Sequence, residues 1–318
     1  MKIVLATPAP PRSRKGNRIT ALRWAKFLRQ LDHRVDVVEE YRTQRCDLLV
    51  ALHARRSFPS IERYRRQYPD SPLVLALTGT DLYGDIHTDA QAQQALTLAD
   101  RFVVLQTEGI AQLPEPLRPK ARVIYQSLRP PAGTFKPRQD QFEVCVLGHM
   151  RPVKDPFRTA EAAHLLPASS RLHITHIGGA LSAAMATRAR TEEQSNPRYR
   201  WLGELPRWQA LRRLAQSRLL VLTSIMEGGA NAVSEALACN IPVISTHISG
   251  SIGLLGSGYP GYFPVGDVPV LARLLTRAET DAAFYNTLKT HCRHRAPLVD
   301  PARERASWAE LLEEFSAS

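Results

Sequence analysis

Long hydrophobic runs are absent from this chain. No apolar run approaches the length of about 20 residues that a bilayer-spanning helix needs, and the short apolar stretch at the start gives way to a series of prolines. A secretory signal peptide needs a longer apolar region than this one. We therefore expect a cytoplasmic protein without integral membrane contact.

Cysteine is also scarce. The four cysteines, Cys46, Cys145, Cys239 and Cys292, lie far apart, and no two of them form a Cys-x-x-Cys pair. Such spacing predicts neither a zinc site nor a disulfide framework. We expect no bound metal and a reducing compartment.

Acidic residues are few in one part of the chain only. The whole chain has 42 Lys and Arg against 30 Asp and Glu, a formal net charge of +12. Residues 1–66 hold 16 basic and 6 acidic side chains, a net of +10, which leaves +2 for residues 67–318. A basic region can indicate nucleic-acid binding. The chain lacks the motifs that would support it, so we expect no nucleic acid partner.

Short apolar runs alternate with helical stretches throughout the chain. The runs that read as strands are Lys2–Ala6, the stretch near Val35, Asp47–His53, Pro72–Leu77, Arg101–Gln106, Ala121–Ser127, Phe142–His149, Arg171–Gly179, Arg198–Gly203, Arg218–Ser224 and Ile241–His247. This alternation predicts an α/β protein with two Rossmann-like, doubly wound parallel-sheet domains that face a cleft. We place the domains at 1–130 and 140–300, joined by a proline-rich linker, and expect a terminal helix at 301–316 that can pack back on the first domain.

The first helix shows the pattern of an amphipathic helix. Asn17 is a candidate N-cap. We expect the buried face to carry Ile19, Leu22, Phe27, Leu28 and Leu31.

The stretch SIMEGGANAVSEALACNIPVIST follows a predicted strand and carries two carboxylates eight residues apart. Gly228 and Gly229 allow a ligand to approach the backbone closely. Asn231 is expected to begin a helix whose free N–H groups suit a diphosphate. Glu235, about one turn into that helix, is placed to accept hydrogen bonds from a pair of hydroxyls, and Glu227 lies just before the helix.

This stretch resembles the E-x7-E motif of family 4 glycosyltransferases, which have the GT-B fold. The family pattern is roughly E-G-x-x-N-x-x-x-E-A-L-A-x-G-x-P-V-I. It is matched at Glu227, Gly228, Asn231, Glu235, Ala236, Leu237, Ala238, Pro242, Val243 and Ile244. Asn240 stands where the family usually has glycine, a mild change because Asn also adopts the left-handed conformation at a helix end.

The resemblance implies a nucleotide-sugar site in the second domain. Glu235 would hold the ribose hydroxyls and Glu227 would contact the sugar ring. The amides of Gly228, Gly229, Ala230 and Asn231 would lie on phosphate and sugar. Gly178 would form a glycine turn near the nucleotide, and Leu202 and Gly203 would lie beside the base, although either turn is also consistent with ordinary turn chemistry.

A second motif, GHMRPVKDP, ends the first strand of the second domain. The family usually has G-R-x-x-x-x-K here, with cations that stabilise the charge on the leaving diphosphate. Lys154 fits the lysine position, while His149 occupies the usual arginine position. Either Arg151 supplies the second charge from a remodelled loop, or His149 takes part. We favour Arg151, and assign Arg151, Lys154 and Glu227 to catalysis.

Three segments at strand ends of the first domain are expected to bind the acceptor. They contain Arg14, Lys15, Gly16, Asn17 and Arg18, then His53 and Arg55, then Thr78, Gly79, Thr80 and Asp81. His53 is a candidate base or a packing residue. Asp81 is a candidate to orient an acceptor hydroxyl, or a helix cap.

The segments GNRITALRWAKFL, LTGTDLY and GHMRPVKDP together resemble a narrower group, the selenosugar synthases of selenoneine biosynthesis. That resemblance implies transfer of a sugar from a UDP-sugar, usually UDP-N-acetylglucosamine, to selenophosphate, with no metal and no cofactor besides the donor substrate. A basic acceptor domain suits a small anionic acceptor. The alternative is a family 4 enzyme with another acceptor, such as a small hydroxylated metabolite or an anionic lipid.

Overall fold

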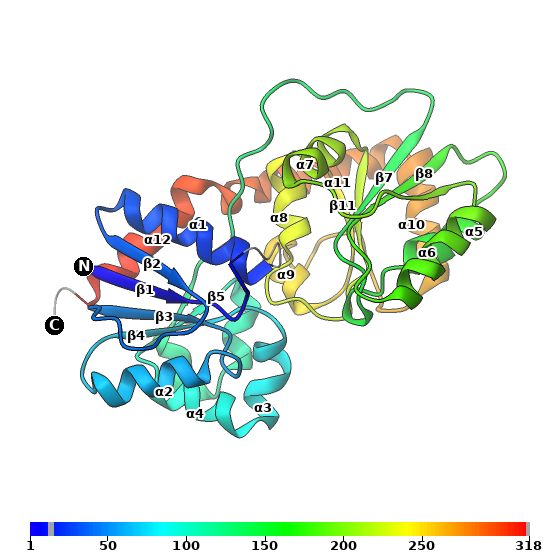
Figure 1. Ribbon diagram of the computed structural model, residues 1–318. Helices are drawn as coiled ribbons and strands as arrows, with labels where there is room; N and C mark the ends of the chain where they lie inside the picture. Colours follow the sequence, from blue (N-terminus) through cyan, green and yellow to red (C-terminus); the bar gives the residue numbers. More distant parts are fainter. Residues whose placement is uncertain (12–15, 316–318) are drawn as a thin grey trace. The chain divides into compact units, whose positions relative to one another are not determined.

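The computed structural model describes residues 1–11 and 16–315, and it divides the chain into two compact units (Figure 1). The first unit is Met1–Gln126 together with the C-terminal segment from Pro301. The second unit is Ser127–Asp300. Each unit is built around one parallel sheet.

The first unit contains a six-stranded sheet in the order β2-β1-β3-β4-β5-β6. Its strands are β1 (Lys2–Ala6), β2 (Arg34–Val38), β3 (Leu48–Leu52), β4 (Leu73–Leu77), β5 (Arg101–Val104) and β6 (Ala121–Val123). Its helices are α1 (Gly16–Gln30), α2 (Phe58–Gln67), α3 (Ile86–Thr88), α4 (Ala90–Leu98) and α12 (Pro301–Glu313), with short turns η1 (Asp81–Asp85), η2 (Thr107–Gln112) and η3 (Glu115–Lys120).

Successive side chains of β1 point to opposite faces of the sheet, and each face has its own part of the core of the first unit. Ile3 and Leu5 pack with side chains of α1 and α12, whereas Val4 and Ala6 pack with side chains of α2 and α4. Figure 1 shows the same division, with α1 and α12 on one side of the strands and α2 and α4 on the other. Successive side chains of a strand point to opposite faces, so both faces need a helical cover.

Helix α1 differs in detail from its prediction. The helix begins at Gly16, so Asn17 lies inside its first turn and is not the N-cap. Leu22 was expected on the buried face, yet it is 48% exposed. Phe27 and Leu28 are buried as predicted, together with Ala21 and Trp24. A helix turns 100° per residue, which carries Leu22 away from this buried stripe.

Helix α12 returns to pack on α1. The rings of Trp24 and Trp308 meet edge to face with centroids 5.0 Å apart. The buried Glu304 carboxylate accepts hydrogen bonds from Trp24 Nε1 at 2.7 Å and from Arg23 Nε at 3.0 Å. The contact between the two tryptophan rings and the hydrogen bonds to the Glu304 carboxylate hold α12 to the first unit.

The second unit also contains a six-stranded parallel sheet, in the order β12-β11-β10-β7-β8-β9. Its strands are β7 (Phe142–Leu147), β8 (Leu172–Ile177), β9 (Tyr199–Trp201), β10 (Leu219–Leu222), β11 (Val243–Thr246) and β12 (Tyr262–Phe263). Its helices are α5 (Arg158–His164), α6 (Ala183–Ser195), α7 (Arg207–Gln216), α8 (Asn231–Ala238), α9 (Ser249–Leu255), α10 (Val268–Thr280) and α11 (Ala282–Arg295), with short turns η4 (Pro152–Lys154) and η5 (Ala296–Val299).

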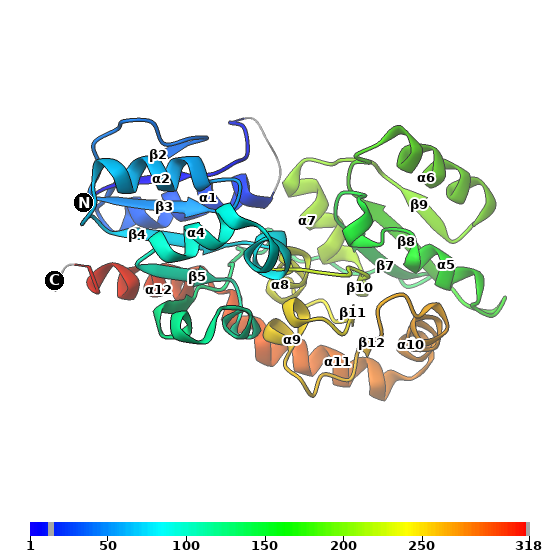
Figure 2. The same ribbon diagram turned by 90° about the horizontal axis from the view of Figure 1, so that it is seen from below.

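The predicted pair of doubly wound parallel sheets is confirmed. Counted from β7, the second sheet has the strand order 3-2-1-4-5-6 of a Rossmann domain. Figure 2 shows α8 next to β10 in this unit. Strand β12 was not predicted, because two residues are too few to show the alternation of apolar and polar side chains that identifies a strand. Among the described residues, no helix combines the length and the apolar character needed to cross a bilayer.

Candidate functional site

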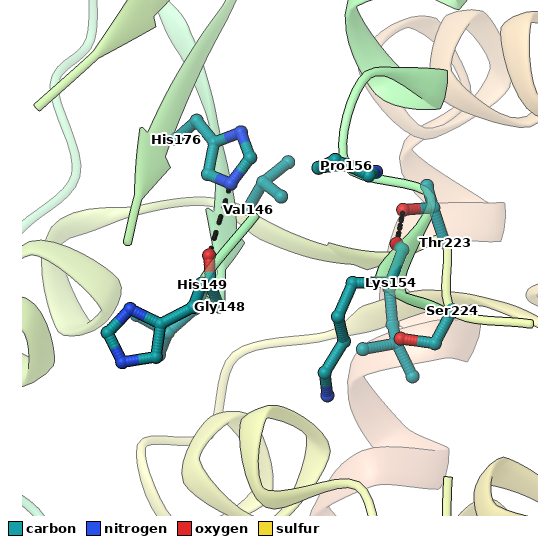
Figure 3. Close-up of a pocket in the computed structure, with 10 residues that line it drawn as sticks. Val146, Gly148, His149, Lys154, Pro156, His176, Thr223 and Ser224 are labelled. Carbon is teal, nitrogen blue, oxygen red and sulfur yellow. Dashed lines mark hydrogen bonds between the residues drawn. The ribbon is translucent and has the colours of Figure 1, made fainter. Parts of the chain in front are cut away.

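The order of the second sheet creates a switch point between β7 and β10. The chain adds β8 and β9 on one side of β7, then crosses over and adds β10, β11 and β12 on the other. Ligands of doubly wound sheets bind at such points, outside the carboxyl ends of the strands. A small pocket lies here (Figure 3), lined by Val146, Leu147, Gly148, His149, Lys154, Pro156, His176, Leu222, Thr223 and Ser224.

Two glycine turns meet beside the pocket. A Cβ on Gly178 would lie 1.9 Å from the carbonyl oxygen of Gly148, and Gly178 has a φ of 157°. No other residue fits this approach without moving the backbone. The Gly178 amide also donates to the carbonyl of Gly203 at 2.8 Å, and the Leu202 amide donates to the carbonyl of His176 at 3.0 Å. The turns that follow β7, β8 and β9 are therefore joined.

His176 supports this junction from inside the sheet. Its Nε2 lies 3.2 Å from the Gly148 carbonyl, and its Nδ1 lies 3.0 Å from the Tyr199 hydroxyl. A carbonyl only accepts, so Nε2 carries the ring proton and Nδ1 accepts from the tyrosine. Burial lowers the pKa of His176 from 6.5 to about 4. The ring is therefore neutral at ordinary pH and acts as a structural bridge.

His149 is also fixed in orientation. The amide of Gly179 donates to His149 Nδ1 at 3.0 Å. In the neutral ring Nε2 then carries the proton, so it can act as a hydrogen-bond donor. In Figure 3 the His149 ring and the Lys154 ammonium extend toward the same end of the pocket, away from His176.

Lys154 and Glu227 form an ion pair beside the pocket. Lys154 Nζ donates to Glu227 Oε1, and the Ser224 hydroxyl donates to the same oxygen at 2.6 Å. The side chains of Lys154 and Glu227 are 22% and 10% exposed. Charge-assisted hydrogen bonds in so sheltered a place hold the ammonium and the carboxylate in defined positions.

Further hydrogen bonds join the loops that carry this pair. The Thr223 hydroxyl lies 2.9 Å from the Lys154 carbonyl and 2.8 Å from the Asp155 carbonyl. The Thr246 hydroxyl donates to the Ser224 carbonyl at 2.6 Å. A Cβ on Gly250 would lie 2.2 Å from the Glu227 carbonyl oxygen, so only glycine allows this approach. The geometry of the pair follows from the packing of three loops.

Arg151 lies apart from the pocket lining. It is exposed at the N-cap of η4, and its carbonyl accepts from the Lys154 amide at 2.9 Å. His149, the alternative at the family's arginine position, is a lining residue. The catalytic role of Arg151 remains a prediction.

Helix α8 begins at Asn231, as predicted, and Ala230 is its N-cap. Gly228 and Gly229 lie in the loop before it, so the free amides of its first turn follow the Glu227 segment. Glu235, in the second turn, is buried. Its Oε1 lies 2.9 Å from Nη2 of Arg207, the first residue of α7.

In the first unit, two predicted segments come together at the ends of β3 and β4. His53 is buried and has a φ of 78°, which is rare for a residue other than glycine. Its Nε2 lies 3.4 Å from the Thr80 hydroxyl and 3.8 Å from Asp85 Oδ2, and its Nδ1 accepts weakly from the Arg56 amide. Burial lowers the pKa of His53. Arg55 Nε donates to Asp85 Oδ2 at 3.1 Å.

Asp81 connects these two segments through the backbone. It is fully buried. Its carboxylate accepts from the amides of Ala54 at 3.1 Å, Thr78 at 3.1 Å and Gly79 at 2.8 Å. These contacts give Asp81 a structural role, because its carboxylate holds the turns after β3 and β4 together. The sequence had suggested two other roles, orienting an acceptor hydroxyl or capping a helix.

The third predicted acceptor segment is described only in part, because Arg14 and Lys15 lie outside the described residues. Gly16, Asn17 and Arg18 form the first turn of α1. Arg18 is 8% exposed. Within the described part of the chain, its Nε and Nη1 are buried without a hydrogen-bond partner.

Sequence reasoning missed Ser224, His176 and Arg207. Ser224 and His176 both lie at the end of predicted strands, so their position was a usable signal. Arg207 belongs to no motif, and its contact with Glu235 depends on how α7 packs beside α8.

Comparison with known proteins agrees with this architecture. Residues 134–295, just over half of the chain, match the family described as glycosyl transferases group 1. Sucrose-phosphate synthase from Thermosynechococcus elongatus superposes with a TM-score of 0.77 at 16% identity, covering 100% of this chain and 99% of that one. Anabaena HepE in complex with UDP gives a TM-score of 0.78 at 16% identity, covering 98% and 99%. HepE in complex with UDP-glucose gives 0.75 at 16% identity, covering 99% and 100%.

These structures confirm the predicted GT-B fold. A search of curated proteins found no match. The match over residues 134–295 nevertheless covers the whole of the second sheet with its pocket, and the chain belongs to the glycosyl transferases group 1 family.

Proposed function

We propose that this protein transfers a sugar, N-acetylglucosamine, from a UDP-sugar to selenophosphate, and that this step forms the carbon–selenium bond of selenoneine biosynthesis. The observation that carries the transferase part is the Lys154–Glu227 pair beside the switch-point pocket. The UDP and UDP-glucose complexes of HepE support a uridine nucleotide as the donor. The narrower acceptor rests on the resemblance to selenosugar synthases.

The donor in this proposal binds along the second sheet. Glu235 accepts hydrogen bonds from the ribose hydroxyls, and the loop of Gly228, Gly229 and Ala230 approaches the phosphates and the sugar. The first-turn amides of α8 face the diphosphate, where the helix dipole favours negative charge. Glu227, held by Lys154 and Ser224, contacts the sugar ring.

The leaving group needs cations because negative charge develops on UDP as the glycosidic bond breaks. Lys154 supplies one fixed positive charge beside the pocket. Nε2 of His149 supplies a hydrogen bond, and Arg151 supplies a second charge from the same loop. Preorganised groups of this kind stabilise the transition state without reorganising when the reaction occurs.

The acceptor in this proposal is an oxyanion bound by the first unit. Two buried guanidinium nitrogens of Arg18 lack partners among the described residues, and a buried donor left unsatisfied is costly. A selenophosphate oxygen that accepts from Arg18 removes this cost. Arg14 and Lys15, which closely precede Arg18 in the sequence, add positive charge.

The chemical step requires no general base. A selenium lone pair of selenophosphate forms the bond to the anomeric carbon, while the bond from that carbon to the UDP oxygen breaks and its electron pair leaves with UDP. In this scheme His53 does not act as a base. Both of its ring nitrogens already contact other groups, the Arg56 amide and the Thr80 hydroxyl. We also propose that the reaction needs no divalent cation and no cofactor.

The direct test is incubation of the protein with UDP-N-acetylglucosamine and selenophosphate, followed by mass spectrometry. We expect UDP and a selenium-bearing sugar in equal amounts, with the same yield after treatment with EDTA. Loss of activity in EDTA would contradict the metal-independent mechanism.

Controls separate the donor from the acceptor. If UDP binds but selenophosphate does not stimulate UDP release from the UDP-sugar, the acceptor assignment is wrong. The alternative acceptors, a small hydroxylated metabolite or an anionic lipid, are then tested in the same assay. If UDP does not bind, the donor assignment fails as well.

A further inference from the structure

Arg207 reaches the donor site from an element that contributes no known motif residue. It is the first residue of α7 and follows the loop after β9. Its Nη2 lies 2.9 Å from Glu235 Oε1, and its side chain is 40% exposed while that of Glu235 is 10% exposed. The cation therefore lies at the rim, and the carboxylate lies inside.

The surroundings of Glu235 make such a partner necessary. The neighbouring residues of α8, including Val233, Ala236 and Leu237, are buried and apolar. Burial raises the pKa of Cys239, and the negative charge of Glu235 raises it further. A carboxylate in so poorly solvated a place keeps its charge and orientation only if hydrogen-bond donors hold it.

We infer that Arg207 is a positioning residue for nucleotide recognition, which holds the Glu235 carboxylate so that it accepts hydrogen bonds from the ribose hydroxyls. The inference rests on the donor role of Glu235 in the proposed function. A carboxylate has about four acceptor positions on its two oxygens, so a carboxylate that a guanidinium holds at one oxygen can also accept hydrogen bonds from hydroxyls. A planar guanidinium restricts the carboxylate more strongly than an ammonium does.

This role predicts a selective loss of affinity. Arg207 acts through Glu235, so its removal matters only for ligands that Glu235 recognises. Arg207→Ala is expected to weaken UDP binding about tenfold, in keeping with the loss of one charge-assisted hydrogen bond. A UDP analogue that lacks both ribose hydroxyls is expected to bind the variant and the wild type within twofold of each other.

Calorimetry with UDP and competition binding with the analogue test the inference. Arg207→Lys is expected to restore part of the UDP affinity, because it keeps the charge without the planar geometry. In a Glu235→Gln background, Arg207→Ala is expected to have no further effect. Arg213→Ala, an exposed position on the same helix, is the matched control and is expected to bind UDP as the wild type does.

Several outcomes would overturn the inference. Equal losses for UDP and for the analogue would make Arg207 a direct ligand of the phosphates or the base. Unchanged UDP affinity in Arg207→Ala would remove the role altogether. Either result, with a wild type that binds UDP, leaves the proposed function standing, whereas a wild type that does not bind UDP removes both.

Discussion

The ammonium of Lys154 contacts the carboxylate of Glu227, although the two residues are 73 positions apart in the sequence. Lys154 follows β7 and Glu227 follows β10, and these strands are neighbours in the sheet. The pair therefore exists because the strand order brings the two loops together. It holds a cation and an anion at the point where this fold binds ligands.

Removal of the Lys154 charge is expected to affect turnover more than donor binding. Lys154→Ala should lower kcat about 100-fold, because one preorganised donor to a developing anion contributes about that much. The KM for the UDP-sugar should change only a few-fold. Steady-state kinetics test this, with Lys136→Ala, an exposed lysine of the same unit, as the control. Unchanged kcat would exclude a role for Lys154 on the leaving group.

Glu235→Ala is expected to weaken UDP binding about 100-fold. Two hydrogen bonds from hydroxyls to a charged acceptor are lost, and each contributes about 1.5 kcal/mol or more. Calorimetry with UDP measures the effect, and circular dichroism checks that the variant is folded. Glu310→Ala changes an exposed glutamate of α12 and should leave UDP affinity as it is. Wild-type affinity in Glu235→Ala would place the ribose elsewhere.

Arg18→Met separates a binding role from a structural one. Because two Arg18 nitrogens have no partner among the described residues, loss of the guanidinium should not lower the free energy of unfolding. The apparent KM for the anionic acceptor should rise at least about tenfold, with UDP affinity unchanged. Urea unfolding and acceptor kinetics measure the two effects. A less stable variant with an unchanged KM would make Arg18 structural.

Gly178→Ala tests the junction of glycine turns. The new Cβ would meet the Gly148 carbonyl oxygen at 1.9 Å, so the backbone must move, at a cost of about 2–3 kcal/mol in the free energy of unfolding. UDP affinity should fall as well, since the moved turn lies beside the pocket. Gly258→Ala adds a Cβ into open space and should retain stability. Equal unfolding midpoints for the two variants would contradict the close approach.

His176 is expected to make stability depend on pH. Its pKa is about 4 in the folded protein and 6.5 in its ordinary state, so the unfolded chain takes up the proton first. The free energy of unfolding should therefore fall by about 3 kcal/mol as pH drops from 6.5 to 4. His176→Gln keeps a hydrogen-bonding side chain without a titratable group. Urea unfolding at several pH values should show a flatter profile for this variant, and identical slopes would refute the assignment.

Much of the fold could be predicted because it depends on local patterns. Apolar runs such as Lys2–Ala6 and Phe142–Leu147 became strands within a residue or two of their predicted ends. The helix start at Asn231 was also correct, since a glycine pair before a helical pattern is a strong local signal. The exposure of Leu22 was not predicted, because the choice of buried stripe depends on the partner that Trp24 finds in Trp308.

The candidate site also has a part that the sequence predicted and a part that only the tertiary structure decided. Local sequence was enough to place Lys154, Glu227 and Glu235 beside strand ends and a helix start, because turn chemistry and side-chain periodicity act over a few residues. Sheet order and helix packing alone brought Glu227 to Lys154 and Arg207 to Glu235. The physical reason is that an ion pair depends on distance in space, and the sequence separation of two loops does not reveal which strands become neighbours.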